Sequence, residues 1–246
     1  MVWLRRLVIE VTIRVSLLRI DRSTFDQTWL NLWLVSSVID LCPARLRGPG
    51  DENFGAHRMS DNLERAVVWR SHLFDGTEHC GLWRTAQGWE LRGAVVGVQK
   101  DQPMLAYYEV YCDSDWLTRR VQIYGTIGKE AKILALTVED RGVWRGSGQD
   151  LSDLNGCDDV DLAVTPATNT LPIKRLNLQI GQSAAVVAAW IRFPELIVQP
   201  LSQRYTRIDG DTYRYESDTG FSAEIGVDDL GLVTTYSGGW ERIAAL

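Results

Sequence analysis

Two aspartates lie two residues apart in the segment CDDVD, residues 157–161, and their spacing could support chemistry. On a β-strand, side chains two residues apart project from the same face, so Asp159 and Asp161 would be neighbours. Two adjacent carboxylates can bind a metal ion or share a proton. Lys174 and Arg175 follow along the chain, and pairing of the aspartates with these cations is the interpretation that we favour. We therefore predict no catalytic residue and no metal site. An enzyme acting on a sugar- or lipid-like substrate through this pair is the alternative.

The sequence shows none of the common motifs of catalytic or nucleotide-binding proteins. No glycine-rich stretch is followed by the Lys-Ser/Thr pair of a phosphate-binding loop. GQSAA, residues 181–185, lacks the second glycine of a hydrolase nucleophile elbow. Of the three histidines, His72 and His79 lie on either side of a predicted turn. Two histidines supply too few ligands for zinc, which needs three or four from the protein. We expect no cofactor.

A segment bounded by prolines follows the aspartates. In TPATNTLP, residues 165–172, Pro166 and Pro172 interrupt the strand pattern, because proline cannot donate a hydrogen bond to a sheet. The threonines and the asparagine between them can satisfy backbone groups that have no strand partner. We favour a structural corner that turns the following cations toward the two aspartates. The alternative is a polar lip at the mouth of a cavity.

These residues must be positioned by β-strands. From about residue 60 onward, apolar and polar residues alternate with a period of two, and Asp- and Gly-rich turns separate the runs. Asp113 and Asp115 flank one such turn, and residues 196–200 and 203–209 are expected as separate strands. We predict a mainly all-β protein with a single antiparallel, strongly curved or barrel-like sheet of roughly a dozen strands and a few short helices, because closure or curvature protects sheet edges.

The first 58 residues differ from the rest of the chain. The opening apolar stretch is interrupted by charged residues and does not match a secretory signal. Residues 29–42 are too short to span a bilayer. We predict that residues 1–58 are an N-terminal extension and that residues 59–246 form one β domain. A helical arm that packs on the domain is the alternative for the extension.

Composition narrows the class of partner and the compartment. The formal net charge is −6 at pH 7, so no basic surface dominates and nucleic acid is a poor candidate for the partner. The four cysteines form no Cys-x-x-Cys pair, which is typical of reduced cytosolic thiols. No apolar run approaches the roughly 18 residues that a membrane span needs. We expect a soluble, cytoplasmic protein without a transmembrane segment, and the oligomeric state is left open.

Aromatic residues lie on both faces of the expected strands at residues 104–113 and 116–126. Broad aromatic surface beside a few polar groups suits an apolar ligand with a polar head, and a large curved sheet can enclose such a ligand. The alternative is that the aromatic residues are packed core, in a structural or partner-binding domain.

Several segments together resemble one bacterial family. They are DVDLAVTPATNTLPIKRLNLQIGQS, VVAAWIRFPELIVQPLSQRYTRID, FSAEIGVDDLGLV and a terminal Tyr-x-x-x-Trp-x-Arg. Over residues of about 60–243 the chain is similar to the bacterial putative glycolipid-binding family, most specifically in TPATNTLP and QRYTR. The resemblance implies one β-rich domain, similar in shape to bacterial lipoprotein carriers that hold acyl chains in a concave apolar cavity. It implies a glycolipid or another amphipathic small molecule as the ligand, and no catalytic residues.

For such a ligand we predict contacts to the polar head and aromatic stacking. The residues expected to meet the head are Asp161, Thr165, Asn169, Arg175 and Arg204. Those expected to stack on sugar or chain are Trp69, Trp116 and Tyr205. Arginine suits phosphate or carboxylate groups, and asparagine offers both a donor and an acceptor to hydroxyls.

Overall fold

The computed structural model describes residues 62–139, 142–146 and 151–246, which belong to one compact unit, His57–Leu246. The predicted extension, residues 1–58, and the predicted domain start at residue 59 lie outside the described residues. Cys42 lies outside them too. The other cysteines, Cys80, Cys112 and Cys157, are free and buried.

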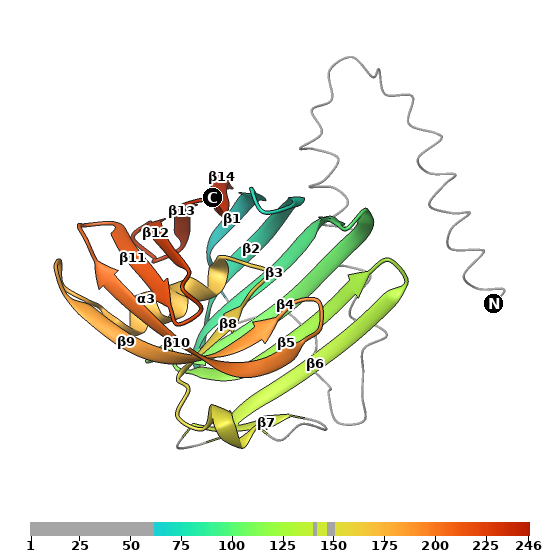
Figure 1. Cartoon of the computed structure of the whole chain (residues 1–246). Helices are drawn as coiled ribbons and strands as arrows, with labels where there is room; N and C mark the ends of the chain where they lie inside the picture. The colour runs from blue at the N-terminus through green and yellow to red at the C-terminus, as the bar shows by residue number, and fades with distance from the viewer. Residues whose placement is uncertain (1–61, 140–141, 147–150) are drawn as a thin grey trace, which may run out of the picture. The chain divides into compact units, whose positions relative to one another are not determined.

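One sheet of 14 strands contains all the described strands, and it curves without closing (Figure 1). In the first half lie β1 (Asn62–Ser71), β2 (Asp75–Thr85), β3 (Gly88–Gln99), β4 (Gln102–Asp113), β5 (Thr118–Ile127), β6 (Glu130–Glu139) and β7 (Val143–Gly146). In the second half lie β8 (Asp159–Leu162), β9 (Ser183–Arg192), β10 (Ile197–Arg207), β11 (Thr212–Ser217), β12 (Ser222–Val227), β13 (Val233–Tyr236) and β14 (Trp240–Ala245). The described helices are short: η1 (Ser152–Leu154), η2 (Ala167–Asn169) and α3 (Thr170–Leu176). None is long and apolar enough to cross a membrane. The predicted curved all-β sheet is confirmed.

The sheet consists of two meanders that meet at one strand pair. Its order is β7-β6-β5-β4-β3-β2-β1-β14-β13-β12-β11-β10-β9-β8, so β1 pairs with β14 and joins the halves. Apart from β8 and β9, chain neighbours within each half pair through short turns, as the Asp- and Gly-rich links predict. In the β4–β5 turn, Asp113 Oδ1 accepts the N–H groups of Asp115 and Leu117, both at 3.0 Å, which confirms the turn predicted there.

β8 is the exception to the antiparallel pattern. It runs parallel to β9, whereas the other pairs are antiparallel. A parallel pair needs a crossover connection, which η2 and α3 supply. Thr118, at the start of β5, contacts the other side of β8: its N–H donates to Asp158 O (3.0 Å) and its Oγ1 accepts Val160 N–H (3.1 Å). These bonds satisfy part of an edge that would otherwise be open.

The two strands expected at residues 196–200 and 203–209 are a single strand, β10. Pro200 lies inside it, opposite Ala189 of β9. On the other side, β11 pairs with β10 only from Gln203 onward. Proline is tolerated at Pro200 because no ladder partner there requires its missing N–H.

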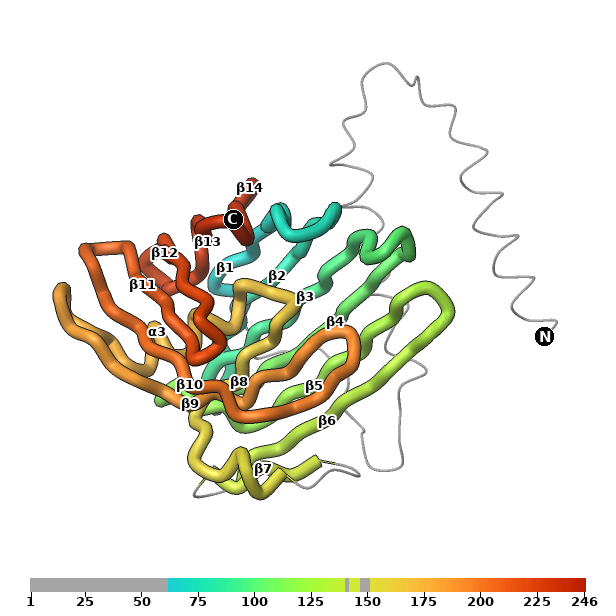
Figure 2. Tube along the Cα trace, in the orientation of Figure 1, coloured from blue at the N-terminus to red at the C-terminus, as the bar shows by residue number. Residues whose placement is uncertain are grey.

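The concave face of the sheet is filled by the chain itself. Residues 159–176, which we call the inner segment, lie within the curve of the sheet, where Figure 2 shows β8 and α3. Leu162, Ala167 and Leu171 of this segment are at most 1% exposed and pack in one hydrophobic core with inward residues of the sheet such as Tyr108. The predicted corner is therefore an internal layer, and its threonines, Thr165, Thr168 and Thr170, are buried.

Candidate ligand-binding site

The two aspartates of β8 have different partners. Asp159 accepts two bonds from the Arg175 guanidinium, from Nη2 at 2.5 Å and from Nε at 3.1 Å, so this predicted pair is confirmed. Asp161 instead accepts a bond from Gln203 Nε2 at 2.6 Å. The predicted pairing with Lys174 is wrong, because the Lys174 ammonium donates to the carbonyl of Asp229. Among the described residues, no group of three or more His, Cys, Asp or Glu side chains could hold a metal ion.

The surroundings give the two carboxyl groups different electrostatics. Burial raises the pKa of Asp159, and the hydrogen bonds and charge of Arg175 oppose that rise. Burial raises the pKa of Asp161 to about 6, opposed only by the neutral amide of Gln203. Asp159 is thus held in an ion pair, whereas Asp161 is half-buried and titrates just below neutral pH.

A third acid, Glu78 on β2, lies in the core with no cation bonded to it. Its Oε1 accepts hydrogen bonds from the Tyr108 hydroxyl (2.5 Å) and the Thr165 hydroxyl (2.6 Å). Its Oε2 is buried and has no hydrogen-bond partner among the described residues. Burial raises the pKa of Glu78 to about 8, although the two hydroxyls oppose the rise. Glu78, Tyr108 and Thr165, which we call the Glu78 cluster, therefore hold a carboxyl group that is mostly neutral at pH 7.

Strand register builds this cluster. Gly93 of β3 lies between Cys80 of β2 and Tyr108 of β4 in the ladder. The Tyr108 ring covers Gly93 so closely that any side chain there would collide with it. The Tyr108 hydroxyl can therefore reach across β3 to Glu78 of β2. Glu78 is two residues from Cys80, so the two side chains project from the same face of β2. Through Thr165, the cluster fastens the inner segment to the sheet.

Tyrosines gather beside the start of α3. The Tyr205 hydroxyl donates to Asn169 Oδ1 (2.9 Å), and the Tyr205 and Tyr215 rings meet edge to face at 5.3 Å. Burial and the nearby Asp161 carboxylate raise the pKa of Tyr205. Three of the predicted residues, Asp161, Asn169 and Tyr205, are thus brought together. Their companions Gln203 and Tyr215 are not among the predicted residues, although the alternation along each strand places them on the same face.

The other predicted residues are dispersed. Trp69 is fully buried and its indole N–H donates to Val233 O (2.8 Å). Trp116 stacks on Trp89 with ring centroids 4.6 Å apart. Arg204 is exposed on the face of β10 opposite Tyr205. Thr165 belongs to the Glu78 cluster and Arg175 to the ion pair with Asp159. None of the eight predicted residues lines the pocket at the β9–β10 turn or the pocket beside the C-terminal end of α3.

A pocket of about 350 Å³ opens at one end of the concave face, and we call it the mouth pocket. The turn between β9 and β10 covers it with Phe193, Pro194 and Glu195. The Phe193 ring lies against Gly125 of β5, where a Cβ atom would come within 2.7 Å of a ring carbon. The absence of a side chain at Gly125 thus lets the turn approach the sheet. The remaining lining residues are Gln99, Lys100, Gln102, Thr126, Ile127, Glu130 and Lys132.

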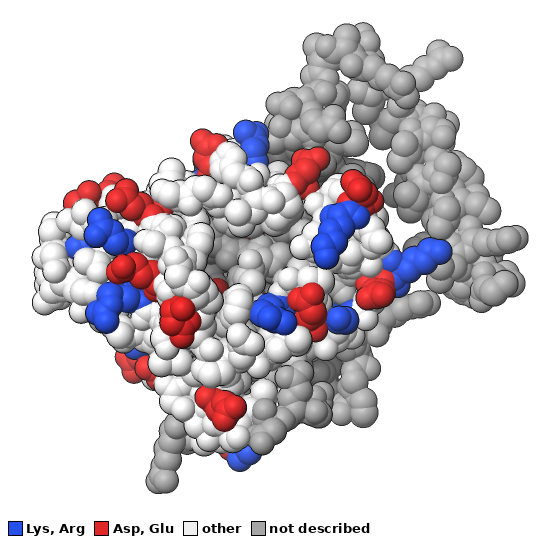
Figure 3. All heavy atoms as spheres, in the orientation of Figure 1, with Lys and Arg blue, Asp and Glu red and all other residues white. Residues whose placement is uncertain are grey.

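The lining of the mouth pocket is amphipathic. Ile127, Phe193 and Pro194 supply an apolar wall, and Lys100 and Lys132 belong to a rim of charged and amide side chains. The same inner face of the sheet continues into buried apolar core at Met104 and Ile123. Figure 3 shows positive and negative side chains intermingled over this view of the molecule, beside uncharged surface.

Fold and site together define an all-β protein with one large curved sheet, a filled concave face and an amphipathic pocket at its mouth. The chain belongs to the family described as "Putative glycolipid-binding", which matches residues 66–242 and confirms the predicted resemblance. It is also similar to the crystal structure of a DUF1089 family protein from Pseudomonas aeruginosa, at 27% identity and a TM-score of 0.60, over 80% of this chain and 100% of that chain. No curated protein matches the sequence.

Proposed function

We propose that this protein is a non-catalytic binding protein for an amphipathic small molecule, with a glycolipid as the ligand class, and that the ligand binds at the mouth pocket. One observation carries the proposal: a pocket of about 350 Å³ combines an apolar wall with a polar rim at the entrance to the concave face. Its volume lies in the range of small-molecule sites, which is roughly 300–1,000 Å³.

In this proposal the rim binds the head and the wall binds the chain. Lys100 and Lys132 offer ammonium donors, and Gln99 and Gln102 offer amides that can both donate to and accept from hydroxyls. The first methylene groups of the chain would lie against Phe193, each buried group contributing about 0.8 kcal/mol. A longer chain must displace the turn at Phe193, because the core beneath it is packed.

We further propose that the binding domain spans residues 59–246 and works in the cytoplasm. The cytoplasmic assignment is supported by the buried, unpaired thiols of Cys80, Cys112 and Cys157.

A matched pair of phenylalanines tests the site. Phe193→Ala removes the apolar wall, whereas Phe221→Ala removes a half-exposed ring in the second half of the sheet. With a fluorescently labelled glycolipid, we expect Phe193→Ala to weaken binding about tenfold, which corresponds to the loss of roughly 1.4 kcal/mol of apolar contact. Phe221→Ala is expected to bind as the unmodified protein does.

Two results would contradict the proposal. Absence of binding by the unmodified protein, together with no lipid in mass spectra of the purified chain, would remove the ligand class. A loss of affinity in Phe221→Ala but not in Phe193→Ala would move the site away from the mouth pocket and toward the tyrosines near α3.

A further inference from the structure

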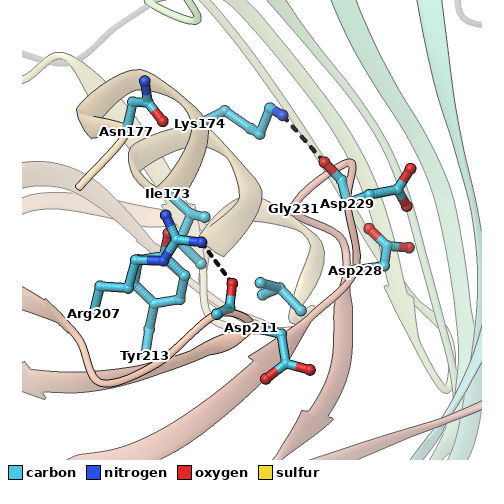
Figure 4. Close-up of a pocket in the computed structure, with 11 residues that line it drawn as sticks. Ile173, Lys174, Asn177, Arg207, Asp211, Tyr213, Asp228, Asp229 and Gly231 are labelled. Carbon is cyan, nitrogen blue, oxygen red and sulfur yellow. Dashed lines mark hydrogen bonds between the residues drawn. The ribbon is translucent and has the colours of Figure 1, made fainter. Parts of the chain in front are cut away.

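A second pocket, of about 560 Å³, lies beside the C-terminal end of α3, and we call it the helix pocket (Figure 4). It is bounded by α3, the β10–β11 turn and the β12–β13 turn. Its lining residues are Ile173, Lys174, Asn177, Arg207, Gly210, Asp211, Tyr213, Val227, Asp228, Asp229 and Gly231. It shares no lining residue with the mouth pocket, and its wall is mainly polar. An acyl chain therefore fits it poorly.

Two of its three acids form ion pairs with arginines that do not line the pocket. Asp228 accepts bonds from Arg65 Nη1 (2.8 Å) and Arg242 Nη1 (2.5 Å). Asp229 is paired with the same Arg65 nitrogen at 2.7 Å. Asp211 is the third acid, and it is exposed at the rim.

Among the described residues, backbone carbonyls rather than carboxylates hold the Arg207 guanidinium in place. Its guanidinium donates to three backbone carbonyls, those of Leu178 (2.9 Å), Asp209 (3.0 Å) and Gly210 (2.5 Å). It also lies over the Tyr213 ring, 5.7 Å from the centroid. Three neutral carbonyls accept three of its five N–H donors and leave its positive charge in the wall of the pocket.

Lys174 supplies the adaptable donor. Its ammonium group bonds the carbonyl of Asp229 at 3.4 Å, a long contact to a neutral group. An ammonium has three donors, so it can bind another acceptor without losing this contact. Figure 4 shows Lys174 extended along the edge of the pocket from α3 toward Asp229. Four cations surround the helix pocket: Lys174 and Arg207 line it, and Arg65 and Arg242 pair with its acids. Three acids line it, so the cations exceed the acids by one.

We propose that the helix pocket is a second binding site, for a small polyhydroxylated molecule that carries a phosphate or carboxylate group. Lys174 binds the anionic group, and Arg207 adds its charge without moving. Asn177 and Asp211 offer amide and carboxylate groups to the hydroxyls, and the Tyr213 ring provides an apolar face for the sugar. This site does not depend on the ligand proposed for the mouth pocket.

Calorimetric titration of the full chain with glucose 6-phosphate tests the proposal, with glucose and inorganic phosphate as separate probes. We expect Lys174→Gln to weaken binding of glucose 6-phosphate at least tenfold, because a hydrogen bond to a charged group is lost. Lys174→Arg, which keeps the charge, should retain most of the affinity. Lys129→Gln removes an exposed lysine that lines neither pocket and should leave binding unchanged.

A second measurement separates a free sugar phosphate from a lipid head group. Phosphatidylcholine vesicles containing phosphatidylinositol are sedimented with the protein and with the same variants. Binding that depends on Lys174, in either experiment, supports the site and assigns the source of the ligand. Binding that is equal in Lys174→Gln and Lys129→Gln, or absent with both the sugar phosphate and the vesicles, overturns it. Thermal melting of each variant confirms that the fold is intact.

Discussion

Asp159 and Glu78 are both 1% exposed, yet the protein accommodates them in opposite ways. Asp159 on β8 faces the Arg175 guanidinium, which holds it with two bonds, and Arg175 lies in α3 of the same inner segment. Among the described residues, the hydrogen bonds to the Glu78 carboxyl group come from two hydroxyl groups. An isolated charge in a protein core is costly, so it is either paired or removed by a proton. The inner segment is therefore attached to the sheet by a neutral cluster, while an ion pair holds the two arms of the segment together.

The largest effect is expected from breaking the ion pair. Arg175→Met leaves Asp159 buried without a cation and should lower the free energy of unfolding by about 3–5 kcal/mol. Urea denaturation measures the change, and exposed Arg204→Met is the control, expected to lie within about 0.5 kcal/mol of the unmodified protein. Adding Asp159→Asn should recover part of the loss. If Arg175→Met were as mild as the control, Asp159 would not depend on its cation.

The next effect is a pH dependence that belongs to Glu78. Because the folded protein keeps a proton on this group up to a pKa of about 8, while the unfolded chain releases it near 4.5, its stabilising contribution is full below pH 4.5 and is lost as pH rises toward 8. Between pH 6 and 8 the loss should reach about 2 kcal/mol. Because Glu78→Gln cannot lose this proton, its free energy of unfolding relative to the unmodified protein should rise by that amount between pH 6 and pH 8. A difference that does not vary with pH would mean that Glu78 is ionised in the core.

A smaller effect is expected at the segment side of the same cluster. Thr165→Val removes one of the two hydroxyls on Glu78 Oε1 and should cost about 1–2 kcal/mol. It should also raise the pKa of Glu78 further, because a bond that lowers it is lost. Thr206→Val, at an exposed hydroxyl of β10, is the control. Retention of the Glu78 pH dependence at its original midpoint would show that Thr165 does not contribute to the cluster.

At pH 7 the smallest effect is expected at Asp161, which resembles Glu78 in that none of the described cations bonds to it, but which is only half-buried. Its pKa of about 6 lies above that of the unfolded chain, so the stability it contributes is full below about pH 3.8 and is lost as pH rises to 6. Asp161→Asn should change stability at pH 7 by less than about 1 kcal/mol and remove the pH dependence below 6. Urea denaturation of Asp161→Asn and of the unmodified protein, each at pH 4 and at pH 7, measures the change.

The alternation along the strands predicted the class of fold, because burial on one face of a sheet repeats every two residues. Short turns also made neighbouring strands adjacent, which holds for most of this sheet. The sequence predicted two strands in place of the single strand β10, because proline normally interrupts a strand. Pro200 is tolerated here because, at that position, β10 pairs with β9 but not with β11. The parallel orientation of β8 was not predicted, because the alternation of apolar and polar residues does not indicate where a crossover connection places a strand.

The candidate site was less accessible to sequence reasoning. Arg175 and Asp159 are 16 residues apart and lie next to a recognisable motif, so their pairing could be predicted. Glu78 and Thr165 are 87 residues apart, and nothing in either local sequence indicates the other. The mouth pocket depends on Phe193 meeting Gly125, a contact between distant strands that only the curvature of the sheet creates.

The pairing of β1 with β14 also governs when the domain can form during synthesis. The first meander can assemble as it leaves the ribosome, but its strand β1 lacks its second neighbour until β14 has been synthesised. Contacts between such distant segments fold slowly, since a long loop must close before they contribute. The nascent first half therefore waits with one unpaired strand, and a chain cut before β14 would lack the strand that pairs with β1 and joins the two halves.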